Sequence, residues 1–164
     1  MTRRKPGLVE FERLYERDFR SFVRVARAIV GDAQLAVDAV HDGFVAAIRG
    51  RDGYRGDGPF EAWVWRAVVN AARKGRAARA GVLPLLSVDA LGETREDRDE
   101  LRLAPVLLAL PERQRLVVFL RYYADLDYRA IAATLGIEVG TVSATLSAAH
   151  RSLRKALQEV ETHG

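Results

Sequence analysis

The sequence of 164 residues contains no cysteine, and none of its hydrophobic runs approaches the about 20 residues that a membrane-spanning helix needs. Without cysteine the chain can form no disulfide, no thiolate nucleophile and no cysteine-ligated zinc or iron–sulfur site. The basic start, "MTRRKPGLVEFERLYERDF", has no apolar run behind it, so it is unlike a secretory signal. We therefore expect an unprocessed cytoplasmic protein that does not insert into a membrane.

The sequence also lacks the motifs of common enzymes and the pattern of β-strands. It has no Walker-type glycine loop, no nucleophile elbow and no paired catalytic carboxylates. No segment alternates with period two over the length of a strand, whereas apolar residues recur at the three-and-four spacing of helices. These patterns predict an all-α protein with helices at about 8–30, 34–49, 60–78, 105–110, 113–123, 128–135 and 139–160.

Residues 80–104 separate the predicted helices into two groups. This stretch, "AGVLPLLSVDALGETREDRDELRLA", is acidic and has little apolar periodicity, which is typical of a linker. A hydrophobic content of 49% is enough for one medium domain or for two small domains, each with its own core. We predict two small helical domains, residues 8–79 and 105–160, joined by a flexible linker at residues 80–104.

Basic residues gather at the end of the third predicted helix. From Arg66 to Arg79 the chain has five basic residues and no acidic residue, close to two tryptophans, although its net charge is only +4. Arginines that follow phosphates, beside aromatic rings that stack on bases, suit single-stranded nucleic acid. Trp63 and Trp65 cannot share one narrow helix face, so packing of one or both in the core stays an open alternative.

Residues 128–155, "YRAIAATLGIEVGTVSATLSAAHRSLRK", have the pattern of a helix, a turn at Gly136 and a second helix. A helical projection places an apolar stripe on the side that would pack on the preceding helix, and a smooth, weakly polar face on the other side. The stripe consists of Val142, Leu146, Ala149, Leu153 and Leu157, and the outer face includes Ala144, Ser147, Ala148 and Arg151. This pattern fits a DNA-binding helix-turn-helix and also fits two helices that merely pack together.

Several motifs together resemble the extracytoplasmic-function (ECF) subfamily of bacterial RNA polymerase sigma-70 factors. In the first unit they are "FERLYERDFRSFVRVARAIVGD", "AVDAVHDGF" and "FEAWVWRAVVNAARK". In the second unit the resemblance lies in "LPERQRLVVFLRYYADLDYRAIAATLGIEVGTVSATL". The motifs occur in the family's order and spacing, which is far more specific than a single helix-turn-helix match.

The resemblance implies that Asp38, His41 and Asp42 contact the clamp of core RNA polymerase. They are spaced i, i+3 and i+4, so they share one helix face. An ordinary solvated face and a metal site are alternatives at this spacing. Val37 stands where the family commonly has an acid, which predicts a weaker contact.

The resemblance further implies that the loop at 54–60 captures a base flipped from the non-template strand and that the following helix melts the promoter. Lys74 departs from the family by replacing a frequent acid. The residues expected to contact single-stranded DNA are Tyr54, Arg55, Phe60, Trp63, Trp65, Arg66, Asn70, Arg73, Lys74 and Arg76.

The second unit would bind the upstream promoter element and the flap of the polymerase. Relatives often carry Lys-Ser-Arg where this chain has Ser143, Ala144 and Thr145, so the usual bidentate contact to guanine is missing. We predict recognition through DNA shape and phosphates. The expected contacts are Tyr128, Thr141, Ser143, Ala144, Ser147, Arg151, Arg154 and Lys155.

The sequence thus predicts a sigma factor without enzymatic activity, cofactor or metal, whose partners are core RNA polymerase, promoter DNA and, as a family-level expectation, an anti-sigma factor. A stand-alone helix-turn-helix regulator is the main alternative, and it leaves the basic, tryptophan-containing helix without a role. An adaptor that binds only protein is a third interpretation. Binding to core polymerase separates the first interpretation from the second, and promoter-dependent transcription separates it from the third.

Overall fold

The protein is all-α in residues 4–56, 58–78 and 105–163, which are the residues that the computed structural model describes. The prediction of an all-α fold is confirmed, and no strand occurs in these three ranges. The predicted linker, residues 80–104, lies outside the described residues. The named elements are α1 (Leu8–Val30), α2 (Ala33–Arg49), the 3-10 helix η1 (Arg51–Gly53), α3 (Phe60–Ala78), α5 (Glu112–Tyr122), α6 (Tyr128–Leu135) and α7 (Val139–His163), and residues 105–109 are also helical.

Local side chains and glycines set the ends of these helices. α1 ends at Gly31, whose φ of 79° is in the left-handed region that glycine adopts without strain. Asp32 then begins α2, because its Oδ1 accepts a hydrogen bond from the backbone N–H of Leu35 at 2.8 Å. Asp127 caps α6 in the same way, and Gly136, with φ at 66°, makes the turn between α6 and α7.

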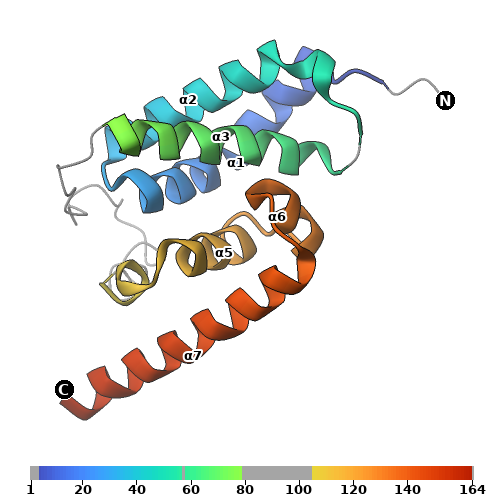
Figure 1. Ribbon diagram of the computed structural model, residues 1–164. Helices are drawn as coiled ribbons and strands as arrows, with labels where there is room; N and C mark the ends of the chain where they lie inside the picture. The colour runs from blue at the N-terminus through green and yellow to red at the C-terminus, as the bar shows by residue number, and fades with distance from the viewer. Residues whose placement is uncertain (1–3, 57, 79–104, 164) are drawn as a thin grey trace.

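The helices form two layered groups, as Figure 1 shows. α1, α2 and α3 pack on one another, and α5, α6 and α7 form the second group, with α3 against α6 and α1 against α5. In the first group Phe22 lies between two aromatic rings. It stacks on Trp65 with ring centroids 3.9 Å apart and meets Phe44 edge-on at 5.1 Å.

The two groups share one continuous cluster of buried residues. The hydroxyl of Ser21 joins them directly, because it donates to the carbonyl of Tyr123 at 2.9 Å. The hydroxyl of Thr134 donates within α6 to the carbonyl of Ala130 at 2.8 Å, and its oxygen lies 3.4 Å from the carbonyl oxygen of Ala62 in α3. Thr134 is only 2% exposed. The two groups share this cluster because α3 packs against α6 as well as against α1 and α2.

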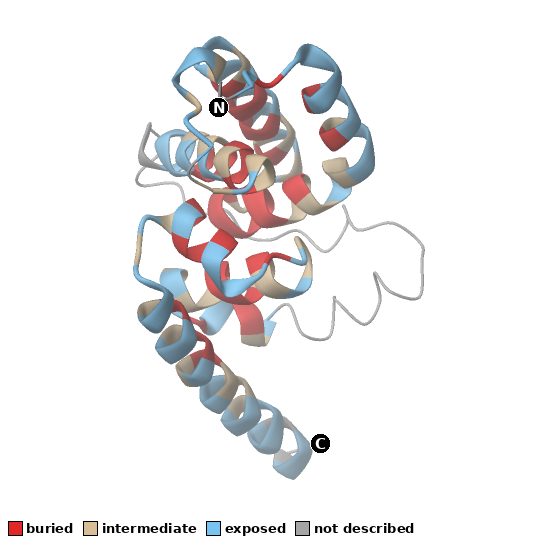
Figure 2. Ribbon diagram, turned by 90° about the vertical axis from the view of Figure 1, so that its right-hand side faces the viewer, coloured by how far each residue is buried: buried red, intermediate tan, exposed pale blue. Residues whose placement is uncertain are grey.

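α7 packs on the second group only with its first half. Val142, Leu146 and Ala149 are buried, as predicted for the inward stripe, and Leu153 is half-buried. Leu157 was expected in the same stripe, but it is 41% exposed. Figure 2 shows the reason, because the last turns of α7 extend beyond α5 and α6 as an exposed helix.

Among the described residues, no single helix combines the length and the hydropathy of a membrane span. α6 and α7 reach that hydropathy only when they are taken together, and the pair is bent by 101° at its break. The residues of α7 that raise the hydropathy include the buried stripe, which packs inside the second group.

Candidate nucleic-acid interface

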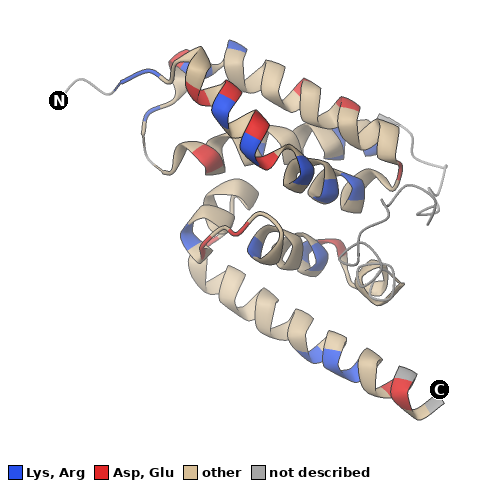
Figure 3. Cartoon of the chain, turned by 180° about the vertical axis from the view of Figure 1, so that it is seen from behind, with Lys and Arg blue, Asp and Glu red and all other residues tan. Residues whose placement is uncertain are grey.

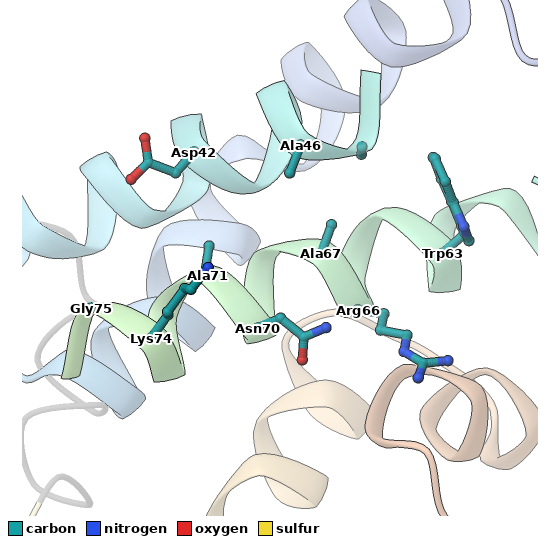
Figure 4. A pocket seen from close by; sticks show the side chains of 10 residues that line it. Asp42, Ala46, Trp63, Arg66, Ala67, Asn70, Ala71, Lys74 and Gly75 are labelled. Carbon is teal, nitrogen blue, oxygen red and sulfur yellow. The ribbon is translucent and has the colours of Figure 1, made fainter. Parts of the chain in front are cut away.

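A groove of about 750 Å³ runs between α2 and α3. Residues of α3 that are three or four positions apart lie along one face of that helix and line the groove. Its lining consists of Asp42, Ala46 and Ala47 of α2 and Trp63, Arg66, Ala67, Asn70, Ala71, Lys74 and Gly75 of α3. Figure 4 shows Ala46 and Ala67 pointing toward one another across it.

The lining combines a small apolar floor with a polar rim. The alanines leave room beside the half-buried ring of Trp63, and Arg66, Asn70 and Lys74 are exposed around them. An aromatic edge with an amide and two cations nearby suits a base together with its phosphate. Asp42, which the sequence placed with the polymerase contacts, lies on the same groove.

The close contact of α2 with α3 depends on Gly43. A Cβ atom at this position would lie 2.6 Å from the Cα of Val68 and 2.7 Å from its Cγ2. No side chain fits there, because real Cβ contacts are not that short. Gly43 therefore allows the two backbones to approach closely enough to bring Asp42 and Ala46 beside α3.

We expect Gly43→Ala to destabilise the protein by about 1–3 kcal/mol, the usual cost of overpacking a core. Urea denaturation followed by circular dichroism measures this loss. Gly140→Ala in α7 is the matched control, since a Cβ there meets nothing within 4 Å and alanine favours a helix. If Gly43→Ala is as stable as the control, α2 and α3 are not held at this spacing by Gly43.

The three predicted polymerase contacts lie together on the exposed surface of α2. The ring of His41 is hydrogen-bonded through Nε2 to the hydroxyl of Tyr15 at 2.9 Å and is stacked against that ring and Phe19. Asp38 accepts a hydrogen bond from Gln34 at 3.1 Å. In the described part of the chain no group of three or more metal-binding side chains comes together.

Arg73 and Arg76 lie on another side of α3 and contact the second group of helices. The Nε atom of Arg73 is 3.2 Å from Oε1 of Glu112, and Nη1 of Arg76 is 2.6 Å from Oε2 of the same residue. Burial and the charge of Arg76 lower the pKa of Arg115, with Glu112 acting in the opposite direction. Glu112 thus stands among three arginines.

Aromatic contacts and hydrogen bonds hold the described residues of the loop at 54–60. Tyr54 donates its hydroxyl to the carbonyl of Gly58 at 2.6 Å, and its ring lies 5.5 Å from that of Trp63 and 6.2 Å from that of Phe60. Arg55 is exposed. The structure therefore joins this loop to the edge of the groove through Trp63.

Trp65 does not belong to this surface. It is 1% exposed and stacks on Phe22, so it has no free face with which to contact DNA. Trp65 is therefore a core residue, as the alternative in the sequence analysis allowed, and it is not part of the candidate interface. Trp63, two positions away on another face of the helix, keeps its place.

The predicted upstream-element residues follow the outer side of α6 and α7. Thr141 is half-buried, and the others are exposed: Tyr128, Ser143, Ala144, Ser147, Arg151, Arg154 and Lys155. Figure 3 shows the first half of α7 without a charged residue and the cations in its second half. The helix-turn-helix thus presents a smooth polar surface followed by a basic one.

The sequence did not indicate that Glu112 and Thr134 would lie against α3 or that Ala46 would line the groove. Glu112 follows a proline at the start of a helix, where an acid is normally explained by the helix dipole. Its partners are 36 and 39 positions away in the chain. Ala46 carries no chemical signal, although the same helix spacing that groups Asp38 with Asp42 also places it beside Asp42.

The two groups of helices match two parts of one protein family. Residues 14–81 match Sigma-70 region 2, and residues 101–155 match Sigma-70 region 4. The stand-alone helix-turn-helix alternative accounts only for the second of these matches, and it is not favoured. Sigma factors are transcription initiation factors rather than enzymes.

Curated relatives match over most of the chain. The RNA polymerase sigma-E factor of Streptomyces avermitilis is 30% identical over 161 residues, covering 94% of this chain and 87% of that protein. The ECF RNA polymerase sigma-E factor of Escherichia coli is 30% identical over 139 residues, covering 74% of this chain and 73% of the relative.

Solved structures show the same fold. CnrH, solved in complex with the cytosolic domain of CnrY, has a TM-score of 0.71 at 25% identity, covering 93% of this chain and 90% of that one. RpoE of Bartonella quintana, solved with the anti-sigma factor NepR, also has a TM-score of 0.71, at 18% identity and with 92% and 98% coverage. The chain belongs to the ECF subfamily of the sigma-70 factors, which direct RNA polymerase to promoters.

Proposed function

We propose that this sigma factor uses three surfaces in turn: α2 to dock on the clamp of core polymerase, the groove between α2 and α3 to hold a separated strand, and α7 to bind the upstream duplex. The observation that carries this division is the groove, because it brings Trp63, Arg66, Asn70 and Lys74 together on one face of α3. Asp42 stands at its border with the docking surface. Docking and strand capture would therefore occur side by side.

Strand capture would depend on aromatic and cationic side chains rather than on a catalytic group. A base that leaves the duplex loses stacking worth about a few kcal/mol, which a fitted pocket and phosphate contacts must replace. Trp63 and Tyr54 offer ring surfaces, and Arg66 and Lys74 offer charge for the adjoining phosphates. Polymerase then performs nucleotidyl transfer, and the sigma factor itself catalyses no reaction.

Upstream binding would depend mainly on shape and phosphates. Ser143 and Ser147 are exposed on α7, and Arg151, Arg154 and Lys155 follow at the basic end. Hydroxyls and cations on a helix position it on a duplex, while methyl groups such as that of Ala144 can contact thymine. The partners are core polymerase and promoter DNA in the cytoplasm, with a separate anti-sigma factor as the regulator.

Reversing the charge of the docking surface is expected to weaken the association with polymerase. Asp38→Arg with Asp42→Arg replaces two exposed carboxylates, so the affinity for core polymerase should fall at least tenfold, while the fold is kept because rim charges affect association more than stability. Titration of labelled protein with core polymerase measures the affinity, and run-off transcription tests the function.

Glu12→Arg with Glu16→Arg is the matched control, because it makes the same change of charge on exposed positions of α1 with the same spacing. This pair should leave the affinity within about twofold of the unchanged protein if general charge is not the cause. Equal losses in both variants would remove the assignment of docking to α2.

A further inference from the structure

Residues 4–7 form an arm that leads into α1 and is fixed beside η1. Pro6 is buried, and its ring restricts the backbone of the arm. Lys5 forms an ion pair with Asp52 of η1. The hydrogen bond from Lys5 and its positive charge lower the pKa of Asp52. The arm therefore has a defined position on the first group of helices.

The arm, η1 and the loop before α3 bring basic side chains to one end of the first group. Arg4 and Lys5 are exposed on the arm, and Arg55 is exposed in the loop. Arg51 of η1 is half-buried, and its Nη1 atom donates to the carbonyl of Ile48 at 3.1 Å. Figure 3 shows basic positions on the arm and on the loop at this end. We call Arg4, Lys5, Arg51 and Arg55 the end patch.

The end patch continues the groove between α2 and α3 beyond Trp63. A Cβ atom at Gly50, the residue before η1, would lie 4.0 Å from Cζ2 of Trp63, so the end of α2 lies against that ring. Phe11 of α1 meets the same ring edge-on, with centroids 6.3 Å apart, and the ring of Tyr54 lies 5.5 Å from it. Trp63 thus stands between the groove and the end patch.

The groove is too short to hold a long separated strand. Its lining extends from Trp63 to Lys74 on α3, which is about 17 Å at a rise of about 1.5 Å per residue. Phosphates along one strand are at least about 3.4 Å apart, so the groove accommodates at most about five nucleotides. The phosphates that follow need cations outside the groove, and those past Trp63 would meet the end patch.

We propose that the end patch is a phosphate-binding site for the separated DNA strand where that strand leaves the groove past Trp63. The inference rests on the proposed function of the groove. It adds Arg4, Lys5 and Arg51, which no motif of the sequence indicated. The side chains of Lys5 and Asp52 are 51% and 77% exposed, so their ion pair contributes little stability and a phosphate can replace the carboxylate.

Arg4→Gln with Lys5→Gln is expected to weaken DNA binding only when the strand is long enough to reach the end patch. The full chain, bound to core polymerase, is titrated with two fork-junction templates whose labelled unpaired strands have about 5 and about 15 nucleotides. With the long strand the affinity should fall roughly threefold or more, and the salt slope should become shallower by about 1.4, or about 0.7 for each lost phosphate contact. With the short strand the affinity should stay within about twofold, because that strand ends inside the groove.

Asp52→Asn distinguishes a phosphate contact from a mere anchor of the arm. Lys5→Gln and Asp52→Asn both break the ion pair, so an anchor alone would change the binding of the long strand in the same direction in both variants. For a phosphate site, Lys5→Gln weakens binding and Asp52→Asn strengthens it, because the second variant frees a cation and removes a negative charge. Arg20→Gln with Arg113→Gln, at exposed positions of α1 and α5, removes the same charge and should leave both templates unaffected.

Three results would overturn the proposal. They are changes of the same direction in Lys5→Gln and Asp52→Asn, an equal loss on both templates in Arg4→Gln with Lys5→Gln, and an equal loss of affinity for core polymerase, which would assign the arm to polymerase. Trp63→Ala tests the groove on the short template. If that variant binds the short strand normally, the proposed function fails and the inference with it; if it binds weakly while the arm variants bind the long strand normally, only the end patch is wrong.

Discussion

Replacing Trp65 by alanine is expected to cost about 3–5 kcal/mol of unfolding free energy, the largest loss that we expect from any single substitution in the chain. The ring is 1% exposed and stacks on Phe22 at 3.9 Å, so its removal leaves a cavity between α1 and α3. Denaturation in urea measures the loss. Binding to DNA should change only as far as the protein unfolds.

Trp63→Ala is the matched comparison, because it removes the same ring from the same helix. Trp63 is half-buried at the groove, so we expect a stability cost of about 1–2 kcal/mol, in proportion to the smaller burial. Its affinity for single-stranded DNA should fall with the fold intact. If the two substitutions lower the unfolding free energy equally, or if Trp65→Ala loses DNA binding while it is folded, the assignment of Trp65 to the core and Trp63 to the interface is wrong.

The second large effect is expected for the cations of α7. Arg151→Ala with Arg154→Ala removes two exposed charges, and the affinity for upstream duplex DNA should become less salt-dependent, with a slope that is shallower by about 2. A pre-melted promoter bubble should not restore binding, because the lost contacts are to a site that stays double-stranded. Titrations at several salt concentrations measure the slope.

The cations on α3 should behave in the opposite way. Arg73→Ala with Arg76→Ala should leave polymerase binding nearly intact and reduce strand opening, and a pre-melted bubble should rescue much of the defect, because the strands are already separated. Permanganate footprinting on closed and pre-melted templates measures both. Glu112→Gln is the control, since it breaks the same ion pairs but keeps both arginines. Equal rescue of the α3 and α7 variants would contradict the division of labour.

The positions of the helices could be predicted from the sequence because neighbouring residues set the helix ends. Gly31 and Gly136 stop helices through their own backbone conformations, and Asp32 and Asp127 start the next helices through their own side chains. The helix boundaries therefore agree within about three residues.

The contacts between helices could be predicted less well from the sequence. Helical spacing placed Trp63 and Trp65 on different faces but could not say which of them α1 would cover. The contact of Glu112 with Arg73 and Arg76 joins positions 39 and 36 residues apart, and no single sequence specifies such a pair. The shared core arose for the same reason, because the pairing of α3 with α6 depends on how two whole surfaces fit together.

The position of Glu112 has a consequence for how relatives of this protein can diverge. Arg66, Asn70 and Lys74 line the groove across from Asp42 and the alanines of α2, so substitutions there alter the surface offered to DNA. Arg73 and Arg76 are bound by residue 112, so a change at either is tolerated most easily when residue 112 changes with it. Correlated substitution is therefore expected between α3 and the start of α5 across related chains, on one side of α3 and not on the other.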